Sequence, residues 1–419
     1  MSYKYKSLKY KIKYLNICGQ VGGYDYKCPE THNIKCDIDT KNYNLCVKNQ
    51  SICNDENYSK NDVRIPVANI LSAQDEDDYL DDKCKSKRAY DYNLANSCMH
   101  QNLPIIYEYD NSISLSNFSI CTLNVMGICR QGQLDHDLLI ERVNILRNYI
   151  LNGDCDILCF QEMSVKFFNA LYTADVKEIY PYCYEENLTD ELLTTRNKDI
   201  EVFTMTKQPL SKVTVYELEG NLNYTNSMGI YEYENLIIFN CYLQAGSNKS
   251  IAQEKKWLHY SRCRSQQLTF IKSLIDTQYK DKNIVMLGDF NFNIDDKNMV
   301  WPEQSIFDSL MLQDSWINDD SGYTENTDIN SMRYNNKLIN KHYRYDAIMC
   351  SKNMHINETK LICDQPSLLP KELNEAYEHI IIGNKSLLDK QKIRHNKDDP
   401  ERYDLFVSDH FGVQTNLTI

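Results

Sequence analysis

From about residue 117 onward, apolar and polar residues follow two distinct patterns, short apolar runs and apolar residues at helical spacing. FSICTLNVMGI (118–128), CDILCFQEM (155–163) and LIIFNCYLQ (236–244) are short and largely apolar, which predicts buried strands. LIERVNILRNYIL (139–151) and RSQQLTFIKSLID (264–276) place apolar residues at helical spacing and predict helices. Further strands are expected at EVFTMT, KVTVYEL, SMGIYEY, NIVMLGDFN, YRYDAIMCS and LFVSDHFGVQTNLTI. Strands separated by helices predict a two-sheet α/β sandwich, with its site at the edge where strand ends converge.

The chain before residue 112 has a different character. Residues 1–53 combine a lysine-rich opening, MSYKYKSLKYKIKYLNI, with a cysteine-rich stretch. The opening has apolar residues at helical spacing and predicts a basic amphipathic helix, which either lies on an anionic membrane or virion surface or packs on a neighbour. Residues 54–111 carry the charge runs DEDDYLDD and KCKSKR and are expected to form a polar linker. We therefore place the main domain at residues 112–419.

The chain has sixteen cysteines, and they fall into two populations. Cys28, Cys36, Cys46 and Cys53 are closely spaced in a turn-rich stretch, which is typical either of a small disulfide-stapled module or of a set of free thiols. The C-x₂-C pairs of a structural zinc site are missing there. The later cysteines, such as Cys155, Cys159 and Cys241, lie in apolar runs and are expected to be small core residues.

Charge and hydropathy narrow the range of partners. The net charge of −13 falls almost entirely on residues 112–419. An acidic domain lacks the broad basic face that binds duplex DNA by counterion release, so a nucleic-acid substrate would be held by a local patch. We find no run of about 18 apolar residues and no apolar signal core, and we expect a soluble protein that is intracellular or virion-associated.

Polar residues stand where the predicted strands end. They are Asn124, Glu162, Tyr242, Asp289, Asn291, Arg344, Asp346, Asp409 and His410. Carboxylate and amide oxygens suit a hard cation such as Mg²⁺, for which Mn²⁺ can substitute. Each residue alone has a simpler explanation, because an acid after a strand is commonly a turn or helix cap and a single histidine is commonly structural. The conjunction of five such strand ends favours metal-assisted phosphoester hydrolysis.

The runs TLNVMGI, CFQE, NCYLQAG, GDFN, YRYDAIMCS and VSDHFGV, in this order, resemble the motif set of the endonuclease/exonuclease/phosphatase superfamily, which includes DNase I, exonuclease III and the neutral sphingomyelinases. The resemblance spans roughly residues 117–416. It implies a DNase I-like fold of four layers, in which helices cover two packed sheets. It also implies a Mg²⁺-dependent phosphodiesterase.

The resemblance also implies roles for single residues. On the metal side, Glu162 would be the principal ligand, Asn124 would complete the shell and Asp409 would face the ion.

On the reaction side, the resemblance implies that Asp289 activates the attacking water and that Asn291 holds the phosphate. Asp346 would support His410, which would contact the scissile phosphate. A histidine held by a carboxylate tends to be cationic, which suits a transition state that gains negative charge.

One position departs from part of the family. Sphingomyelinases, phosphatases and DNase I usually carry histidine in an N-x-H-L segment, where this chain has Tyr242. Exonuclease III-like enzymes carry tyrosine there, so Tyr242 is a candidate phosphate contact. Arg264 and Gln267 form an R-x-x-Q-L motif that recurs in sphingomyelinases and tyrosyl-DNA phosphodiesterases. The resemblance thus leaves the branch of the family open.

Three functions remain in competition. A phosphodiesterase acting on nucleic acid is favoured over one acting on phospholipid or inositol phosphate, and the third candidate is a catalytically impaired binding or structural protein. The stretch 351–407 is long for a connection and contains a run expected to be helical at 369–382 and a basic patch at 385–395. It is either a substrate-gripping lid or a solvated decoration. The Tyr/Lys-rich opening followed by Gly-Gly resembles the leader of many giant DNA virus proteins.

Overall fold

The structure is a computed structural model that describes residues 34–35, 46–47, 104–109, 113–127, 136–183, 202–219, 225–246, 254–295, 302–318, 320–330, 332, 341–374 and 399–419. The chain divides into two compact units, residues 1–97 and 98–419. In the first unit, the described part is an antiparallel pair formed by β1 (Ile34–Lys35) and β2 (Cys46–Val47). The predicted basic helix, the cysteine module's bonding and most of the predicted linker lie outside the described residues. None of the described helices is long and apolar enough to cross a membrane.

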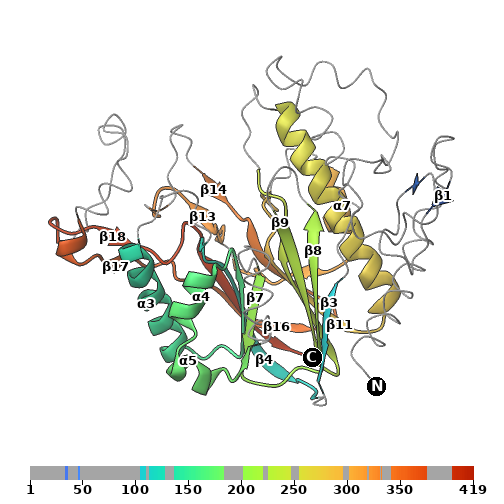
Figure 1. The fold of residues 1–419 in the computed structure, drawn as a ribbon, viewed down its shortest axis with the longest axis horizontal. Coiled ribbons are helices and arrows are strands. Elements are labelled where there is room, and N and C mark those ends of the chain that lie inside the picture. Colours follow the sequence, from blue (N-terminus) through green and yellow to red (C-terminus); the bar gives the residue numbers. More distant parts are fainter. Residues whose placement is uncertain are drawn as a thin grey trace. The chain divides into compact units, whose positions relative to one another are not determined.

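The second unit is built on two sheets (Figure 1). The seven-stranded sheet has the order β12 (Gln313–Asp314), β15 (Asp346–Cys350), β11 (Asn283–Asp289), β10 (Leu236–Tyr242), β9 (Thr225–Glu232), β8 (Lys212–Glu219) and β3 (Ile105–Glu108). The six-stranded sheet has the order β16 (His355–Ile362), β19 (Gly412–Thr418), β4 (Asn117–Asn124), β5 (Ile157–Gln161), β7 (Val202–Thr206) and β6 (Tyr182–Cys183). The apolar side chains of the two sheets form a shared core that includes Ile120, Ile238 and Val285.

Helices cover the outer faces of both sheets. Figure 1 shows α3 (His136–Asn152), α4 (Val165–Leu171) and α5 (Ala174–Ile179) on one side and α7 (Glu254–Gln278) on the other. The first three pack on the six-stranded sheet in one apolar cluster, and α8 (Pro302–Ser309) packs beside α7. The resulting order of helix, sheet, sheet and helix confirms the predicted α/β sandwich of four layers.

Some boundaries differ from the sequence prediction. The strand expected over 405–419 is shorter, because β19 begins at Gly412 and Ser408–His410 lie in the preceding loop. The stretch 351–407 contains β16, which pairs with β19, so its first part belongs to the sheet. Ile105–Glu108 pairs with β8, so the sheet also begins upstream of residue 112.

Several short elements complete the fold. They are the antiparallel pairs β13 (Glu325–Asn326) with β14 (His342–Tyr343) and β17 (Ser367–Leu368) with β18 (Asp404–Leu405), and a 3₁₀ turn, η6 (Lys371–Leu373). The helix expected at 369–382 is described only in this first turn. The basic patch at 385–395 lies outside the described residues.

Strand direction explains why polar residues meet at one edge. β10 and β11 are parallel, and Tyr242 is the register partner of Asp289. β15 runs antiparallel to β11, so its first residue, Asp346, is the partner of Asp289. The end of one strand and the beginning of its antiparallel neighbour therefore meet at the same edge of the sheet.

Gly288 permits the close approach of β11 and β10. Its φ is +130°, and a Cβ built on it would lie 1.9 Å from the carbonyl oxygen of Cys241. Both the backbone conformation and the missing side chain are therefore required immediately before Asp289. This requirement is a physical reason for the glycine in the GDFN motif.

We expect Gly288→Ala to destabilise the protein by about 4 kcal/mol or more, because a backbone clash adds to an unfavourable φ. Urea unfolding followed by circular dichroism measures the loss. Lys280→Ala, at an exposed position before the same strand, should change stability by about 0.5 kcal/mol or less. A Gly288→Ala protein as stable as this control would contradict the steric argument.

Candidate active site

Asn124 links the two sheets at the end of β4. Its side-chain nitrogen donates to Glu162 Oε1 at 3.1 Å and to Asp289 Oδ2 at 2.9 Å. Its Oδ1 accepts a hydrogen bond from the backbone N–H of Met126 at 2.9 Å. Asn124 is buried, and it holds two carboxylates from different sheets next to each other.

Tyr242 makes a second connection between the sheets. Its buried phenol donates to Glu162 Oε1 at 2.7 Å. A phenol has a single hydrogen to donate, so in this arrangement that hydrogen is directed at Glu162. Tyr242 lies at the predicted site, where it contacts the glutamate.

Asn291 is turned toward Asp289. Its backbone N–H donates to Asp289 Oδ1 at 2.8 Å. Its side-chain nitrogen donates to Asp289 Oδ2 at 3.2 Å and to the carbonyl of Leu243 at 2.9 Å. Both amide hydrogens therefore have protein acceptors, and Asn291 fixes the orientation of Asp289.

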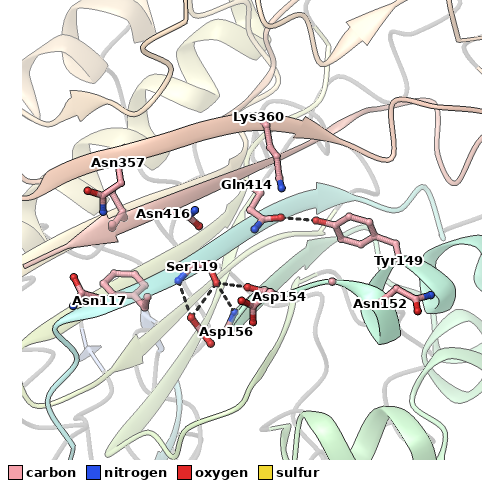
Figure 2. A pocket seen from close by; sticks show the side chains of 13 residues that line it. Asn117, Ser119, Tyr149, Asn152, Asp154, Asp156, Asn357, Lys360, Gln414 and Asn416 are labelled. Atoms are coloured by element: carbon pink, nitrogen blue, oxygen red, sulfur yellow. Dashed lines mark hydrogen bonds between the residues drawn. The ribbon is translucent and has the colours of Figure 1, made fainter.

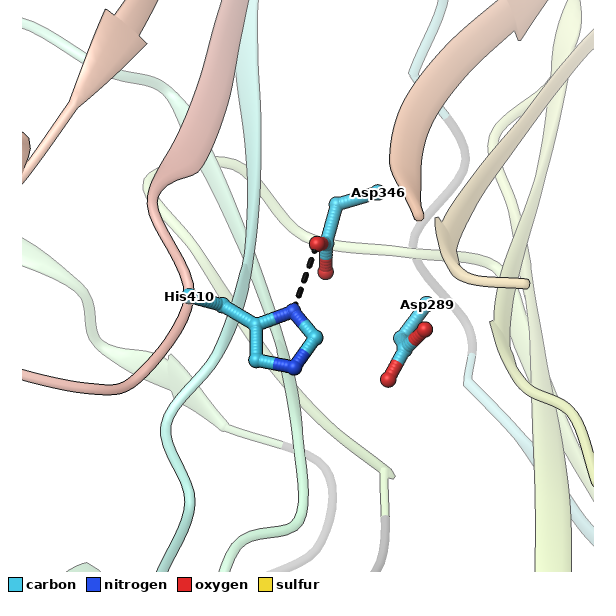
Figure 3. Close-up of side chains that lie close together, drawn as sticks. All are labelled: Asp289, Asp346 and His410. Carbon is cyan, nitrogen blue, oxygen red and sulfur yellow. Dashed lines mark hydrogen bonds and ion pairs between the residues drawn. The ribbon is translucent and has the colours of Figure 1, made fainter. Parts of the chain in front are cut away.

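His410 and Asp346 form a buried pair (Figure 3). His410 Nδ1 lies 2.7 Å from Asp346 Oδ2, and Figure 3 shows Asp289 across the same space. The other ring nitrogen, Nε2, lies 4.0 Å from Asp409 Oδ1. The backbone N–H of Asp346 donates to Thr324 Oγ1, so this hydroxyl helps to place the pair.

Burial and neighbouring charges shift two pKa values in this space. Burial, followed by repulsion from Asp346, raises the pKa of Asp289 to about 7. Burial alone would lower the pKa of His410, but the carboxylates of Asp346 and Asp409 outweigh it and hold this pKa well above its usual range. The site thus combines a proton acceptor near neutrality with a cationic imidazole.

The arrangement fits a divalent cation in its chemistry. Within the described residues, Asp289, Asp346 and His410 are the group of acidic and imidazole side chains close enough to share an ion. His410 and Asp346 already face each other through their hydrogen bond, which argues against both acting as ligands of one ion. Among the described residues, Asp346 Oδ1 has no hydrogen-bond partner although it is buried, so this second oxygen of the pair is an acceptor that is still open.

Backbone strain is concentrated at the same edge. Met126, Glu162 and Asn291 have φ values of 46°, 53° and 56°, in the left-handed region that residues other than glycine rarely adopt. Such conformations cost on the order of 1–3 kcal/mol each and persist where the surroundings enforce them.

Other motif residues support the site from a distance. Arg344, just before β15, donates to Asp295 and to Asp314 of β12, and so ties the beginning of β15 to β12 and to the segment after β11. Arg264 pairs with buried Glu303 and donates to the carbonyls of Gln244 and Gly246, just beyond Tyr242.

A polar bridge behind the site was not predicted from the sequence. Gln161 donates to Asn240 Oδ1 at 2.6 Å, and both are fully buried between the sheets. Both residues lie inside quoted motifs, CFQE and NCYLQAG, so polar letters within apolar runs were the signal that could have found them.

A separate concavity lies at the opposite end of β4 (Figure 2). It has a volume of about 630 Å³ and is lined by polar side chains that include Asn117, Tyr149 and Gln414. Tyr149 donates to Gln414 Oε1 at 2.6 Å. Asn117 begins β4 and Asn124 ends it, so this concavity is distinct from the candidate active site.

The raised pKa of Asp289 has a consequence for stability. A carboxyl whose pKa is higher in the folded state stabilises the fold at a pH below its unfolded pKa, and this contribution is lost as the pH rises through about 7. Asparagine at 289 does not titrate. In EDTA, the unfolding free energy of Asp289→Asn relative to wild type should therefore rise by about 2 kcal/mol between pH 5 and pH 8. Urea unfolding at both pH values tests this.

The matched control for that experiment is Asp281→Asn, because Asp281 is an exposed aspartate before the same strand. The effects of the two substitutions on the unfolding free energy are compared at each pH. An effect of Asp289→Asn that does not change with pH would mean that Asp289 ionises in the fold as it does in water.

The family of the chain follows from a match to a family model. A model of the Endonuclease/Exonuclease/phosphatase family matches residues 121–410. Among solved structures, the chain is similar to TDP2 from Caenorhabditis elegans (14% identity, TM-score 0.46, 72% of this chain and 75% of that chain), to beta toxin 275-280 from Staphylococcus aureus (17%, 0.47, 71% and 99%) and to SmcL (15%, 0.48, 72% and 99%). A search of curated proteins gave no match. The chain belongs to the endonuclease/exonuclease/phosphatase family.

Proposed function

We propose that this protein is a divalent-metal-dependent phosphodiesterase that acts on nucleic acid, with Mg²⁺ as the ion and Mn²⁺ as a substitute. The observation that carries the proposal is the meeting of Glu162, Asp289 and His410 at one edge of both sheets. Asn124 joins the first two directly, and Asp289 lies opposite the His410 pair.

Glu162, Asn124 and Asp409 are the residues that would hold the cation. Glu162 is half-buried, so part of its carboxylate remains accessible after it accepts from Asn124 and Tyr242. A bound divalent cation supplies stabilisation of negative charge on the phosphate and on the leaving oxygen.

Asp289 is placed to take a proton from the attacking water. Its two oxygens are oriented by Asn291 and Asn124, and a pKa near neutrality suits a general base. His410 would donate from Nε2 to a phosphate oxygen, because Asp346 occupies Nδ1. A donor already in place before charge develops stabilises the transition state more than the ground state.

Aromatic side chains next to His410 favour nucleic acid over phospholipid. The ring of Tyr345 lies 6.4 Å from the ring of His410 but is buried. The ring of Tyr343 lies 5.4 Å from that of Tyr345 and is half-buried, so it is the one of the two that a base could reach. Tyr323 stacks on His342 at 5.4 Å, and both are half-buried. Stacking on aromatic rings holds single-stranded bases without the broad basic face that the net negative charge of residues 112–419 argues against.

The first test compares substrates and one variant. With Mg²⁺, the protein should hydrolyse a DNA substrate in a panel of abasic duplex, single-stranded DNA, a 5′-phosphotyrosyl DNA end, sphingomyelin and an inositol polyphosphate. EDTA or Glu162→Gln should lower turnover by about 100-fold or more, because the strongest anionic ligand is lost. The control Glu234→Gln alters an exposed glutamate and should leave turnover unchanged.

Hydrolysis of sphingomyelin or the inositol phosphate alone would replace nucleic acid by a lipid-type substrate and leave the metal mechanism standing. Full activity of Glu162→Gln would refute the mechanism. A wild-type protein inactive on the whole panel, even though it binds Mn²⁺, would favour a binding role.

The second test concerns Tyr242. Tyr242→Phe removes the phenolic hydroxyl and with it one hydrogen bond that orients Glu162. This variant should therefore weaken Mn²⁺ binding by about 10-fold or more. Calorimetric titration measures this, and excess Mg²⁺ should restore kcat. If kcat stays low at saturating metal while affinity is unchanged, Tyr242 instead contacts the phosphate. Tyr149→Phe, which removes a phenol hydrogen bond at the far end of β4, is the control.

A further inference from the structure

Arg142 lies in the middle of α3 and is among the largest fully buried side chains of the described residues. A helix that covers the outer face of a sheet normally directs arginine to solvent, so the burial of Arg142 is unusual. Its Nε donates to the carbonyl of Val407 at 2.6 Å. Its two terminal nitrogens donate to the carbonyls of Val125 and Met126, the latter at 3.3 Å from each nitrogen. One guanidinium therefore joins three backbone carbonyl groups.

These carbonyl groups belong to two loops that are far apart in the sequence. Val125 and Met126 directly follow Asn124 at the end of β4. Val407 directly precedes Ser408–His410, the loop before β19. β4 and β19 are paired strands, so the two loops meet at the end of their ladder, and Arg142 connects them from the helical side beyond the last pair, Thr122 with Val413.

A third segment is tied to the same place. The backbone N–H of Val125 donates to the carbonyl of Gln161 at 2.9 Å, and that of Gly127 donates to the carbonyl of Glu162 at 2.8 Å. A Cβ at Gly127 would lie 2.7 Å from that Glu162 oxygen, so this approach is as close as the backbone permits. The loop that Arg142 grips therefore also sets the position of Glu162.

We propose that Arg142 is a positioning residue that fixes the spacing between the loop after Asn124 and the loop that carries His410. The expected effect on catalysis rests on the proposed phosphodiesterase function, whereas the link between the two loops does not depend on it. Arg142 does not reach the reacting groups itself. It acts through the two loops.

The chemistry of arginine suits this role. Guanidinium is planar and carries five donors in a rigid fork, so it can engage carbonyl groups on two sides at once. Lysine has a compact ammonium on a flexible stem and cannot hold the same span in one geometry. The left-handed backbone of Met126 is a strained conformation that such a grip would help to hold.

Arg142→Lys tests the proposal against two controls on the same helix. Leu146→Ala removes buried apolar packing one turn later on the same helix and leaves the hydrogen bonds from Arg142 to the two loops in place. Arg147→Lys alters a half-exposed arginine paired with Asp175. All variants are measured at a temperature where each is folded, by hydrogen exchange of segments 124–127 and 407–410, by calorimetric Mn²⁺ titration, and by kcat and KM.

Arg142→Lys should speed exchange in both segments together and weaken Mn²⁺ binding by about 10-fold to 100-fold. It should lower kcat by a similar factor with KM changed less than about threefold, whereas Leu146→Ala should alter none of these. Equal effects of the two variants would reduce Arg142 to a core residue and overturn the proposal. A wild-type protein that binds no Mn²⁺ and cleaves nothing would refute the proposed function instead, and the exchange data would still decide the role of Arg142.

Wild type provides a second measurement if Arg142→Lys fails to fold. Native-state hydrogen exchange in low urea should give the two segments one shared opening free energy with the same urea dependence, because one guanidinium holds both. Separate opening free energies for the two segments would overturn the proposal.

Discussion

Hydrogen bonds that cross from one sheet to the other are the constraint on which this structure depends. Asn124 reaches Asp289, Tyr242 reaches Glu162 and Gln161 reaches Asn240, at 2.9, 2.7 and 2.6 Å. Apolar packing between sheets is non-directional and tolerates small shifts, whereas a buried hydrogen bond fixes distance and angle. Leaving any of these groups unpaired would cost on the order of 1–3 kcal/mol. The alignment of the sheets and the geometry of the site are therefore set by the same bonds.

The sequence named candidate site residues and one of their pairs, Asp346 with His410, which the structure contains, but it did not give the partners of Asn124 and Tyr242. The spacing of apolar residues and the order of the motifs placed Asp289 and Glu162 at strand ends, and the structure brings both to one edge. Asp409 and His410 were expected within a strand, although they lie in the loop before β19. Pattern alone does not give strand direction, so it cannot distinguish the end of one strand from the beginning of its antiparallel neighbour.

Other omissions have a similar physical cause. β16 was not predicted because its sequence, HINETKLI, is mostly exposed and polar, as is common for a strand at the edge of a sheet. Tyr242 was considered as a phosphate contact, but its partner is 80 positions away in the chain and on the other sheet. Local sequence carries no information about such a pairing. Site geometry in this fold is a tertiary property, whereas residue identity is a local one.

The position of β19 has a consequence for how the protein is made. This strand lies between β16 and β4, in the interior of the six-stranded sheet, yet it is formed by residues 412–418. During synthesis, β4 emerges from the ribosome long before β19, the strand that pairs with it, and β16 also emerges before β19. Until then their inner edges carry unsatisfied N–H and C=O groups that can recruit strands from other chains. The nascent protein thus passes through an aggregation-prone interval, and a message truncated just before β19 would yield chains that remain in it.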